Sequence, residues 1–118
     1  MNAKFNRHRR DFNENTLEFD VKHYGNGANF TESQWDYEIE TGEFINQYAK
    51  ECFDEIAKSG YKWLKDWSFA GRSGGWFVLL VDCEESDIRP KILGRIETIV
   101  EKYLRGYDKA IAEYYTED

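Results

Sequence analysis

The chain of 118 residues has only two cysteines, two histidines and one proline, and it has no long hydrophobic run. Two cysteines are too few for a disulfide framework, and no histidines stand beside them to complete a zinc site. The longest apolar run covers residues 76–81, well short of the ~20 residues that span a membrane. No apolar segment follows the basic residues near the N-terminus, so we expect no secretory signal, no membrane contact and a cytoplasmic location.

Aromatic and acidic residues, by contrast, are abundant. Aromatics make up 17% of the chain, which is typical of a protein with a packed core rather than of a disordered one. The length suits one domain. The 23 acidic and 16 basic residues give a net charge of −7, and this charge is unevenly distributed. Residues 1–15 are net basic, weakly periodic and rich in polar groups, so we expect a flexible N-terminal arm there and a single acidic domain over residues 16–118.

Hydrophobic periodicity predicts the secondary structure of that domain. Apolar residues alternate with charged ones over 16–24 and again over 35–40, the pattern of half-buried strands. Helical spacing covers 43–58, and Gly60 can end that helix in a left-handed conformation. Two more strand signals, 61–70 and 76–81, flank a glycine-rich loop and predict a hairpin. A final helix is expected from about Pro90, capped by Ser86 or Asp87, and it either runs unbroken to about Tyr115 or bends near Gly106.

This order, ββαββα, predicts an α+β fold in which two helices cover one face of a four-stranded antiparallel sheet. In the strand at 61–70, the aromatic residues share one face, which Lys65 interrupts, while Leu64 falls on the opposite face. Cys52 and Cys83 lie on apolar patterns and are expected in or near the core. Gly94 and Gly106 interrupt the last helix at a cost, which indicates either close packing or simple tolerance.

Acidic residues are densest between 32 and 55, where Lys50 is the only basic residue. Such a surface repels phosphate and attracts cationic groups, so a basic protein is a more suitable partner than nucleic acid. Solubility alone is the simpler explanation for the same charge. If the face is functional, carboxylates would steer the partner and two aromatics would anchor it. The predicted partner-binding residues are Glu32, Asp36, Glu38, Glu40, Asp54, Glu55, Trp35 and Tyr37.

The glycine-rich loop is the most distinctive local motif. Its backbone N–H groups can surround an anion, and Arg72 can add a bidentate contact. The loop lacks the Lys-Ser/Thr of a Walker motif and joins two strands, so it is neither a P-loop nor a dinucleotide fingerprint. A hairpin turn with an exposed arginine is the simpler explanation of the same residues. The candidate loop site comprises Gly71, Arg72, Ser73, Gly74, Gly75 and Trp76.

This Gly-Arg-Ser-Gly-Gly-Trp hairpin with its apolar strand resembles a hairpin in small uncharacterised proteins of phages and mobile elements. The resemblance covers six to ten residues and implies a genomic context without carrying over any activity or catalytic residue. Phage accessory proteins of this size are often inhibitors of host or defence machinery. Taken with the acidic body and the lack of catalytic residues, this context leads us to expect a phage-encoded, anti-defence interaction protein.

An alternative function is a single-stranded nucleic-acid or nucleotide-binding module. It would use Arg72, the basic residues Lys4, Arg7, His8, Arg9 and Arg10, and stacking aromatics on the sheet. Those aromatics, Trp63, Trp67, Phe69 and Trp76, can equally form the core beneath the helices. The basic residues can instead form a solvated tail or neutralise the acidic body.

No residue pattern indicates catalysis. Neither histidine has a partner at metal-ligand spacing, and Ser73 does not lie in a nucleophile elbow. We therefore expect no enzyme activity, no metal and no cofactor. Self-association through the last helix is a third possibility.

Overall fold

The computed structural model describes residues 3–9, 13–21, 43–70 and 76–115, and the following account concerns these residues. Their elements, in chain order, are β1 (Ala3–Arg9), β2 (Glu14–Asp20), α2 (Glu43–Lys58), β3 (Leu64–Ala70), β4 (Trp76–Val81), the 3-10 turn η1 (Glu85–Asp87) and α3 (Pro90–Tyr115). Neither α2 nor α3 combines the length and apolar composition that a membrane-crossing helix needs.

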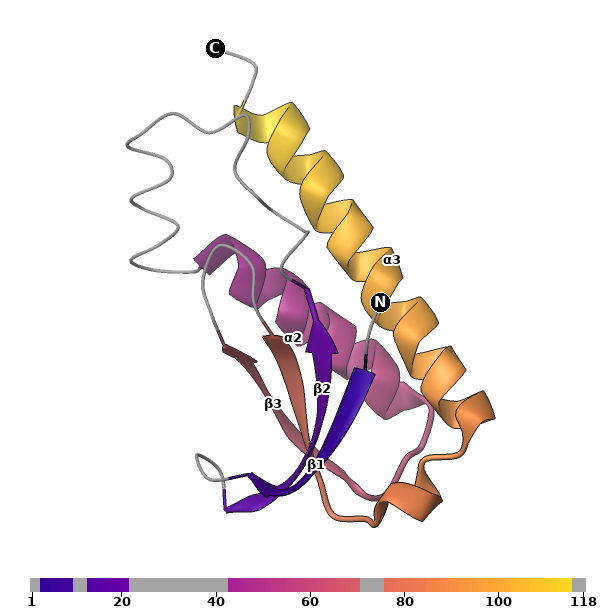
Figure 1. Cartoon of the computed structure of the whole chain (residues 1–118). Helices are drawn as coiled ribbons and strands as arrows, with labels where there is room; N and C mark the ends of the chain where they lie inside the picture. Colours follow the sequence, from indigo (N-terminus) through magenta and orange to yellow (C-terminus); the bar gives the residue numbers. More distant parts are fainter. Residues whose placement is uncertain (1–2, 10–12, 22–42, 71–75, 116–118) are drawn as a thin grey trace.

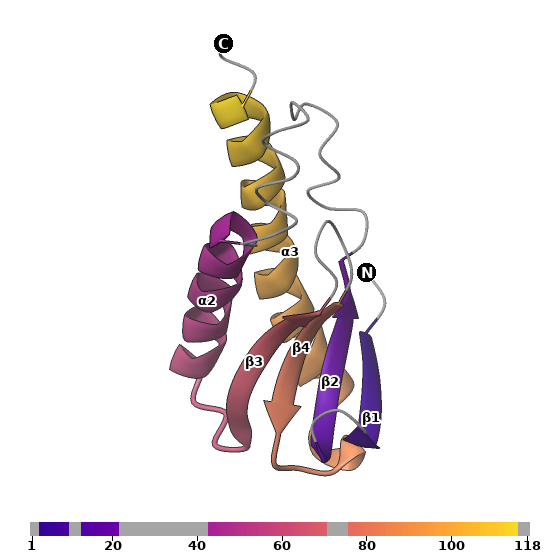
Figure 2. The same ribbon diagram turned by 90° about the vertical axis from the view of Figure 1, so that its left-hand side faces the viewer.

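The four strands form one antiparallel sheet in the order β1-β2-β4-β3. Both helices lie on the same face of this sheet, and the C-terminal half of α3 runs past its end (Figures 1 and 2). The predicted two-layer α+β fold with the order ββαββα is therefore confirmed.

The first strand was not expected. Residues 3–9, predicted to belong to a flexible arm, form β1 and pair with β2 from Ala3↔Phe19 to Arg9↔Glu14. Ala3 and Phe5 pack against the core. The strand predicted over 16–24 is thus the second strand, whose bounds are Glu14 and Asp20. The strand predicted at 35–40 lies outside the described residues.

The core lies between the sheet and the helices. Alternate residues of β2 and β4 point toward α2 and α3, as the two-residue period of a strand requires. Phe19 and Phe77 pair across these strands with ring centroids 6.3 Å apart. The buried core residues are Leu17, Phe19, Val21, Ala49, Cys52, Ile56, Phe77, Leu79, Val81, Ile96, Val100, Leu104 and Tyr107.

A bulge in β3 explains why Lys65 interrupts its apolar face. The pairing with β4 shifts between Leu64 and Asp66. Leu64 is paired with Val81, whose side chain points into the core. Asp66 is paired with Leu80, whose side chain points to the other side of the sheet. Leu64 therefore packs against the core, although regular alternation predicts it on the opposite side of the sheet. Lys65 lies in the bulge and so does not take the inward position that the alternation predicts for it. Lys65 Nζ instead lies 3.0 Å from Glu14 Oε1.

The helix ends follow the predicted signals in part. Gly60 has φ +82° after α2, as its left-handed cap position predicts. Pro90 begins α3, where a missing N–H costs least. The prediction that Ser86 or Asp87 caps α3 is wrong, because both lie in η1, where Asp87 and Glu84 form a reciprocal capping box.

Candidate functional site

The predicted acidic face is only partly within the described residues. Residues 32–40, with six of its eight members, lie outside them. Asp54 and Glu55 lie on α2, and each already has a cationic partner. Lys50 Nζ is 2.9 Å from Asp54 Oδ2, and Lys102 Nζ is 2.7 Å from Glu55 Oε1. Both pairs are solvent-exposed, so their Coulombic gain is small.

Glu55 joins α2 to α3 through two donors. Besides Lys102, the Tyr103 hydroxyl donates to the same carboxylate over 3.1 Å. The hydrogen bond from Lys102 lowers the pKa of Glu55 below its ordinary value. The same bond raises the pKa of Lys102, and burial raises the pKa of Tyr103. This carboxylate therefore stabilises the helix pair at neutral pH.

A polar hollow of about 200 Å³ adjoins this link (the α2 hollow). It is lined by Glu51, Asp54, Glu55, Lys58 and Tyr103. Its lining has three carboxylates and one ammonium group, but Lys50 and Lys102 bind two of these carboxylates, so the charge around the hollow is close to balanced. Because Asp54 and Glu55 are already ion-paired, an incoming cation has to share them with Lys50 and Lys102.

Trp76 is the described member of the candidate loop site, since residues 71–75 lie outside the described residues. Its side chain is 37% exposed, and it is the exposed large hydrophobic residue of the described part of the chain. In the sheet register it stands opposite Asp20 of β2. Because Phe77 points into the core, its neighbour Trp76 points to the face that the helices leave uncovered.

The other candidate stacking aromatics face the core. Trp63, Trp67 and Phe69 pack against it, as the simpler interpretation of this set predicts. Trp63 stacks on Tyr61 at a centroid distance of 5.2 Å, and Trp67 lies 6.4 Å from Phe77. A four-aromatic platform for bases is therefore absent from the described surface, and Trp76 alone of this set lies on the other face.

The face of the sheet that neither helix covers, which we call the open face, follows from the strand registers, and Thr16, Glu18 and Val78 at its centre are nevertheless buried. Cationic residues lie at its β1 side and apolar residues follow β4, while carboxylates stand on β2 and β3. Arg9 binds the mostly buried Glu18 there, which keeps that carboxylate paired. The open-face residues are Lys4, Asn6, Arg9, Glu14, Thr16, Glu18, Asp20, Asp66, Ser68, Trp76, Val78 and Leu80.

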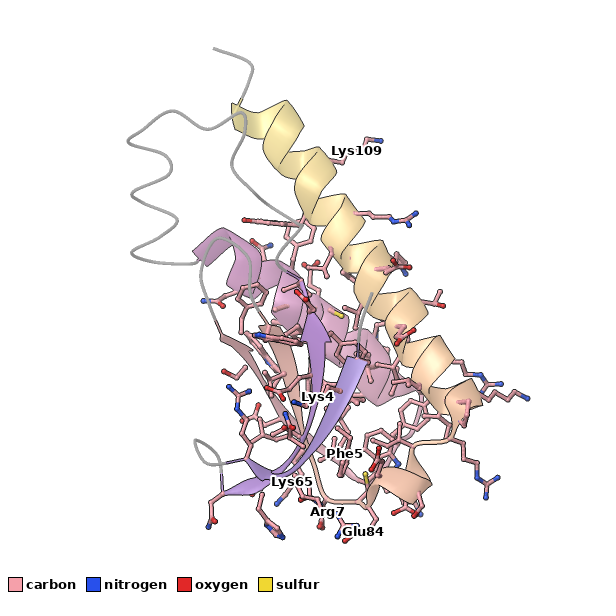
Figure 3. All side chains as sticks on the ribbon, in the orientation of Figure 1. Lys4, Phe5, Arg7, Lys65, Glu84 and Lys109 are labelled. Atoms are coloured by element: carbon pink, nitrogen blue, oxygen red, sulfur yellow. The ribbon has the colours of Figure 1, made fainter. Side chains whose placement is uncertain are left out.

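The basic N-terminal residues support the third interpretation offered for them, neutralisation of the body. Arg7 Nη2 lies 2.7 Å from Glu84 Oε2, and Figure 3 shows the two side chains at the same end of the sheet. Arg9 binds Glu18. Arg10 lies outside the described residues. Lys4 and His8 are exposed on β1.

The thiols are poorly suited to nucleophilic chemistry. Burial raises the pKa of Cys52 to about 12 and that of Cys83 to about 11, so both are protonated at neutral pH. Cys52 is in the core and Cys83 packs against it, as their apolar patterns predict. Among the described residues, no group of three or more His, Cys, Asp and Glu side chains is placed to hold a metal ion.

Two residues of the open face do not stand out in the sequence as site candidates. Asp66 follows the polar positions of its strand, and Leu80 is one residue of a continuous apolar run. The run itself was a usable signal, because a strand apolar at every position indicates cover on both faces. The described helices provide such cover on one face.

Comparisons with known proteins found no relative of this chain. No protein-family model, no curated protein and no solved structure matches the chain significantly.

Proposed function

We propose that this chain is a non-enzymatic interaction protein that binds, and inhibits, a basic or nucleic-acid-handling host protein. The observation that carries the proposal is the excess of carboxylates, 23 against 16 cations, part of which lines a hollow between α2 and α3. Such a charge raises the rate of encounter with a cationic surface and repels free phosphate backbones. The hairpin resemblance supports a phage or mobile-element origin for such an inhibitor.

The α2 hollow supplies the described part of the acidic surface. Glu51 is exposed at its rim and has no ion pair among the described residues. Asp54 and Glu55 continue the surface, although each shares its charge with a lysine. A cationic side chain entering here would gain mainly through steering and orientation, since exposed ion pairs contribute only ~0–1 kcal/mol each.

The proposal is tested by capturing a partner from host lysate at low and moderate salt with three proteins. These are the wild type, the double variant Glu51→Gln/Asp54→Asn, and the control Asp82→Asn/Glu85→Gln, which removes the same charge elsewhere. We expect the hollow variant to retain several-fold less partner and to associate more slowly, while the control stays closer to wild type. The partner's own activity, measured with and without the protein, tests inhibition.

Two results would contradict the proposal. One is capture of no partner at low salt. The other is a partner whose retention is the same for all three proteins and at both salt concentrations.

A further inference from the structure

The solvent side of α3 carries a row of basic residues. The buried side of this helix consists of Ile96, Val100, Leu104 and Tyr107. On the opposite side, exposed residues recur at alternating spacings of four and three, so they fall within about 80° of arc at ~3.6 residues per turn. The row is about 27 Å long at ~1.5 Å per residue. Its members, which we call the basic stripe, are Lys91, Arg95, Thr98, Lys102, Arg105 and Lys109.

Most cations of the basic stripe are available to a partner. Among the described residues, Lys91, Arg95 and Lys109 have no side-chain ion pair or hydrogen bond. The side chain of Lys109 projects away from the sheet (Figure 3). Arg105 Nη2 lies 3.9 Å from Glu101 Oε1, which is too long for a hydrogen bond, and the arginine side chain is 74% exposed.

The centre of the basic stripe is shallow. Lys102 is bound to Glu55 of α2, so an anion would have to share this cation. Gly94 lies on the same side of α3, and a methyl group added there would meet no atom within 4 Å. The Thr98 hydroxyl donates to the Gly94 carbonyl over 2.9 Å, which keeps this side chain close to the helix. A long anion can therefore approach the helix backbone closely between the cations.

We propose that the basic stripe of α3 contacts the phosphate backbone of duplex nucleic acid without reading its base sequence. Contacts from Lys and Arg to phosphate fix position and carry no sequence information. A duplex has one phosphate charge per ~1.7 Å of its axis, so several phosphates face a row of ~27 Å. The inference goes beyond the proposed function and does not depend on it, although a nucleic-acid-handling partner would bring such a backbone close.

Other anionic partners fit the basic stripe less well. The centre of a protein interface is usually aromatic or otherwise apolar, and the stripe has no apolar member. Single-stranded nucleic acid is bound through stacking on aromatic side chains, which the stripe also lacks. A bilayer surface takes up the apolar side of an amphipathic helix, and in α3 that side is packed in the core. A duplex backbone is the partner for which cations alone suffice.

The acidic excess of the chain weakens this contact without abolishing it. Glu97 and Glu101 border the basic stripe on one side, and the net charge of the chain is −7. Exposed charges are screened beyond about 10 Å at 0.1 M salt, so cations at the contact count for more than carboxylates across the molecule. We therefore expect the affinity of a non-specific contact, with a Kd of about 10⁻⁴–10⁻⁶ M.

The test measures the fluorescence anisotropy of a labelled DNA duplex of mixed sequence as protein is added, at salt concentrations between about 50 and 200 mM. A duplex of unrelated sequence should bind equally. Four contacted phosphates predict a slope of about −3.6 for log K against log salt concentration, at ~0.9 per phosphate. Comparison probes are oligo-dT and a poly-Glu peptide, and we expect both to bind more weakly than the duplex.

Variants give the matched comparison. Arg95→Gln/Lys109→Gln removes two unpaired cations of the stripe and keeps good helix formers. We expect it to weaken duplex binding at least about fivefold and to reduce the salt slope by about 2, one for each lost phosphate contact. The control Lys4→Gln/Lys62→Gln removes the same charge from exposed positions outside α3 and should keep the wild-type slope. Equal circular dichroism spectra and urea midpoints show that both variants are folded.

The contrary outcomes are distinct from one another. No change in anisotropy at the lowest salt, with protein at about 10⁻⁴ M, would overturn the proposal. Equal losses in the stripe variant and the control would also overturn it, because net charge and not the stripe would then govern binding. Tighter binding of oligo-dT, or stronger competition by poly-Glu than by unlabelled duplex, would replace the duplex with a single strand or with an acidic protein. None of these results affects capture of a protein partner through the α2 hollow, so the two proposals fail separately.

Discussion

Asn15 shows how much one side chain contributes to this fold. Its Oδ1 accepts the backbone N–H of His8 over 3.0 Å, and its Nδ2 donates to the carbonyl of Cys83 over 2.9 Å. His8 has a positive φ of 46°, which is rare for a residue other than glycine. Asn15 therefore holds the irregular end of β1 and ties β2 to the segment that follows β4.

We expect Asn15→Ala to lower the free energy of unfolding by about 1–3 kcal/mol, since two hydrogen bonds are lost and each is worth ~0.5–1.5 kcal/mol net. Urea denaturation followed by circular dichroism measures this. Asn46→Ala, at an exposed position in α2, is the control and should cause no loss because alanine favours helices. Equal stabilities for the two variants would show that Asn15 contributes nothing.

Some positions were predictable from the sequence at this scale and others were not. Gly60, Pro90 and Cys52 follow local rules of backbone conformation and hydrophobic spacing, and the structure places them as those rules predict. Lys65 and Trp76 were ambiguous, because their sides of the sheet depend on a bulge and on pairing with distant strands. Candidate residues 32–40 and 71–75 lie outside the described part of the chain and stay predictions.

The helix α3 contains two glycines that its packing does not require. A methyl group added at Gly94 would meet no atom within 4 Å, and one added at Gly106 would meet Tyr48 Cε1 at 3.7 Å, an ordinary contact. Of the two explanations given by the sequence, close packing and tolerance, tolerance therefore fits Gly94. Both Gly94→Ala and Gly106→Ala should stabilise the protein by about 0.5–1 kcal/mol.

Thermal or urea unfolding of the two glycine variants measures these gains in the free energy of unfolding. Gly60→Ala provides the opposite control, because φ +82° strains any residue with a Cβ. It should destabilise the protein although the space around Gly60 is open. A loss of stability in Gly94→Ala would mean that this position is constrained by more than helix propensity.

The link between α2 and α3 makes part of the stability depend on pH. Because the pKa of Glu55 is lowered in the folded state, its contribution is present above the ordinary carboxyl pKa of 4.5 and is lost as pH falls. The pKa of Lys102 is raised, so its contribution is present below 10.5 and is lost as pH rises. The Glu55–Lys102 pair therefore stabilises the fold between about pH 4.5 and pH 10.5.

We expect Lys102→Met to raise the pKa of Glu55 toward its ordinary value, as measured by NMR titration of the carboxyl group. The stability difference between wild type and variant should be largest near neutral pH and should shrink toward pH 3. Lys109→Met is the matched control, since Lys109 lies on the same helix and projects away from the sheet (Figure 3). An unchanged Glu55 titration in Lys102→Met would contradict the inferred bond.

At the scale of the whole molecule, the least predictable feature is the way β1 completes the sheet. Its sequence has only two inward apolar residues, Ala3 and Phe5, before a bulge ends the alternation. Local patterns therefore resemble those of a polar arm. What stabilises β1 is non-local: its pairing with β2 and the bond from Arg9 to the mostly buried Glu18.

Deleting residues 1–9 distinguishes a strand of the fold from a flexible arm. The deletion exposes core side chains, removes the pairing of β1 with β2 and leaves Glu18 without Arg9, and removal of one member of such a partly buried ion pair costs up to roughly 3–5 kcal/mol. We expect a loss of at least about 3 kcal/mol in urea unfolding, or no cooperative transition. A transition that coincides with that of the full chain would mean that residues 1–9 are dispensable.

Two point variants address the same question without truncation. Arg9→Met should cost far more stability than Arg7→Met, because Arg7 and Glu84 form an exposed pair worth only ~0–1 kcal/mol.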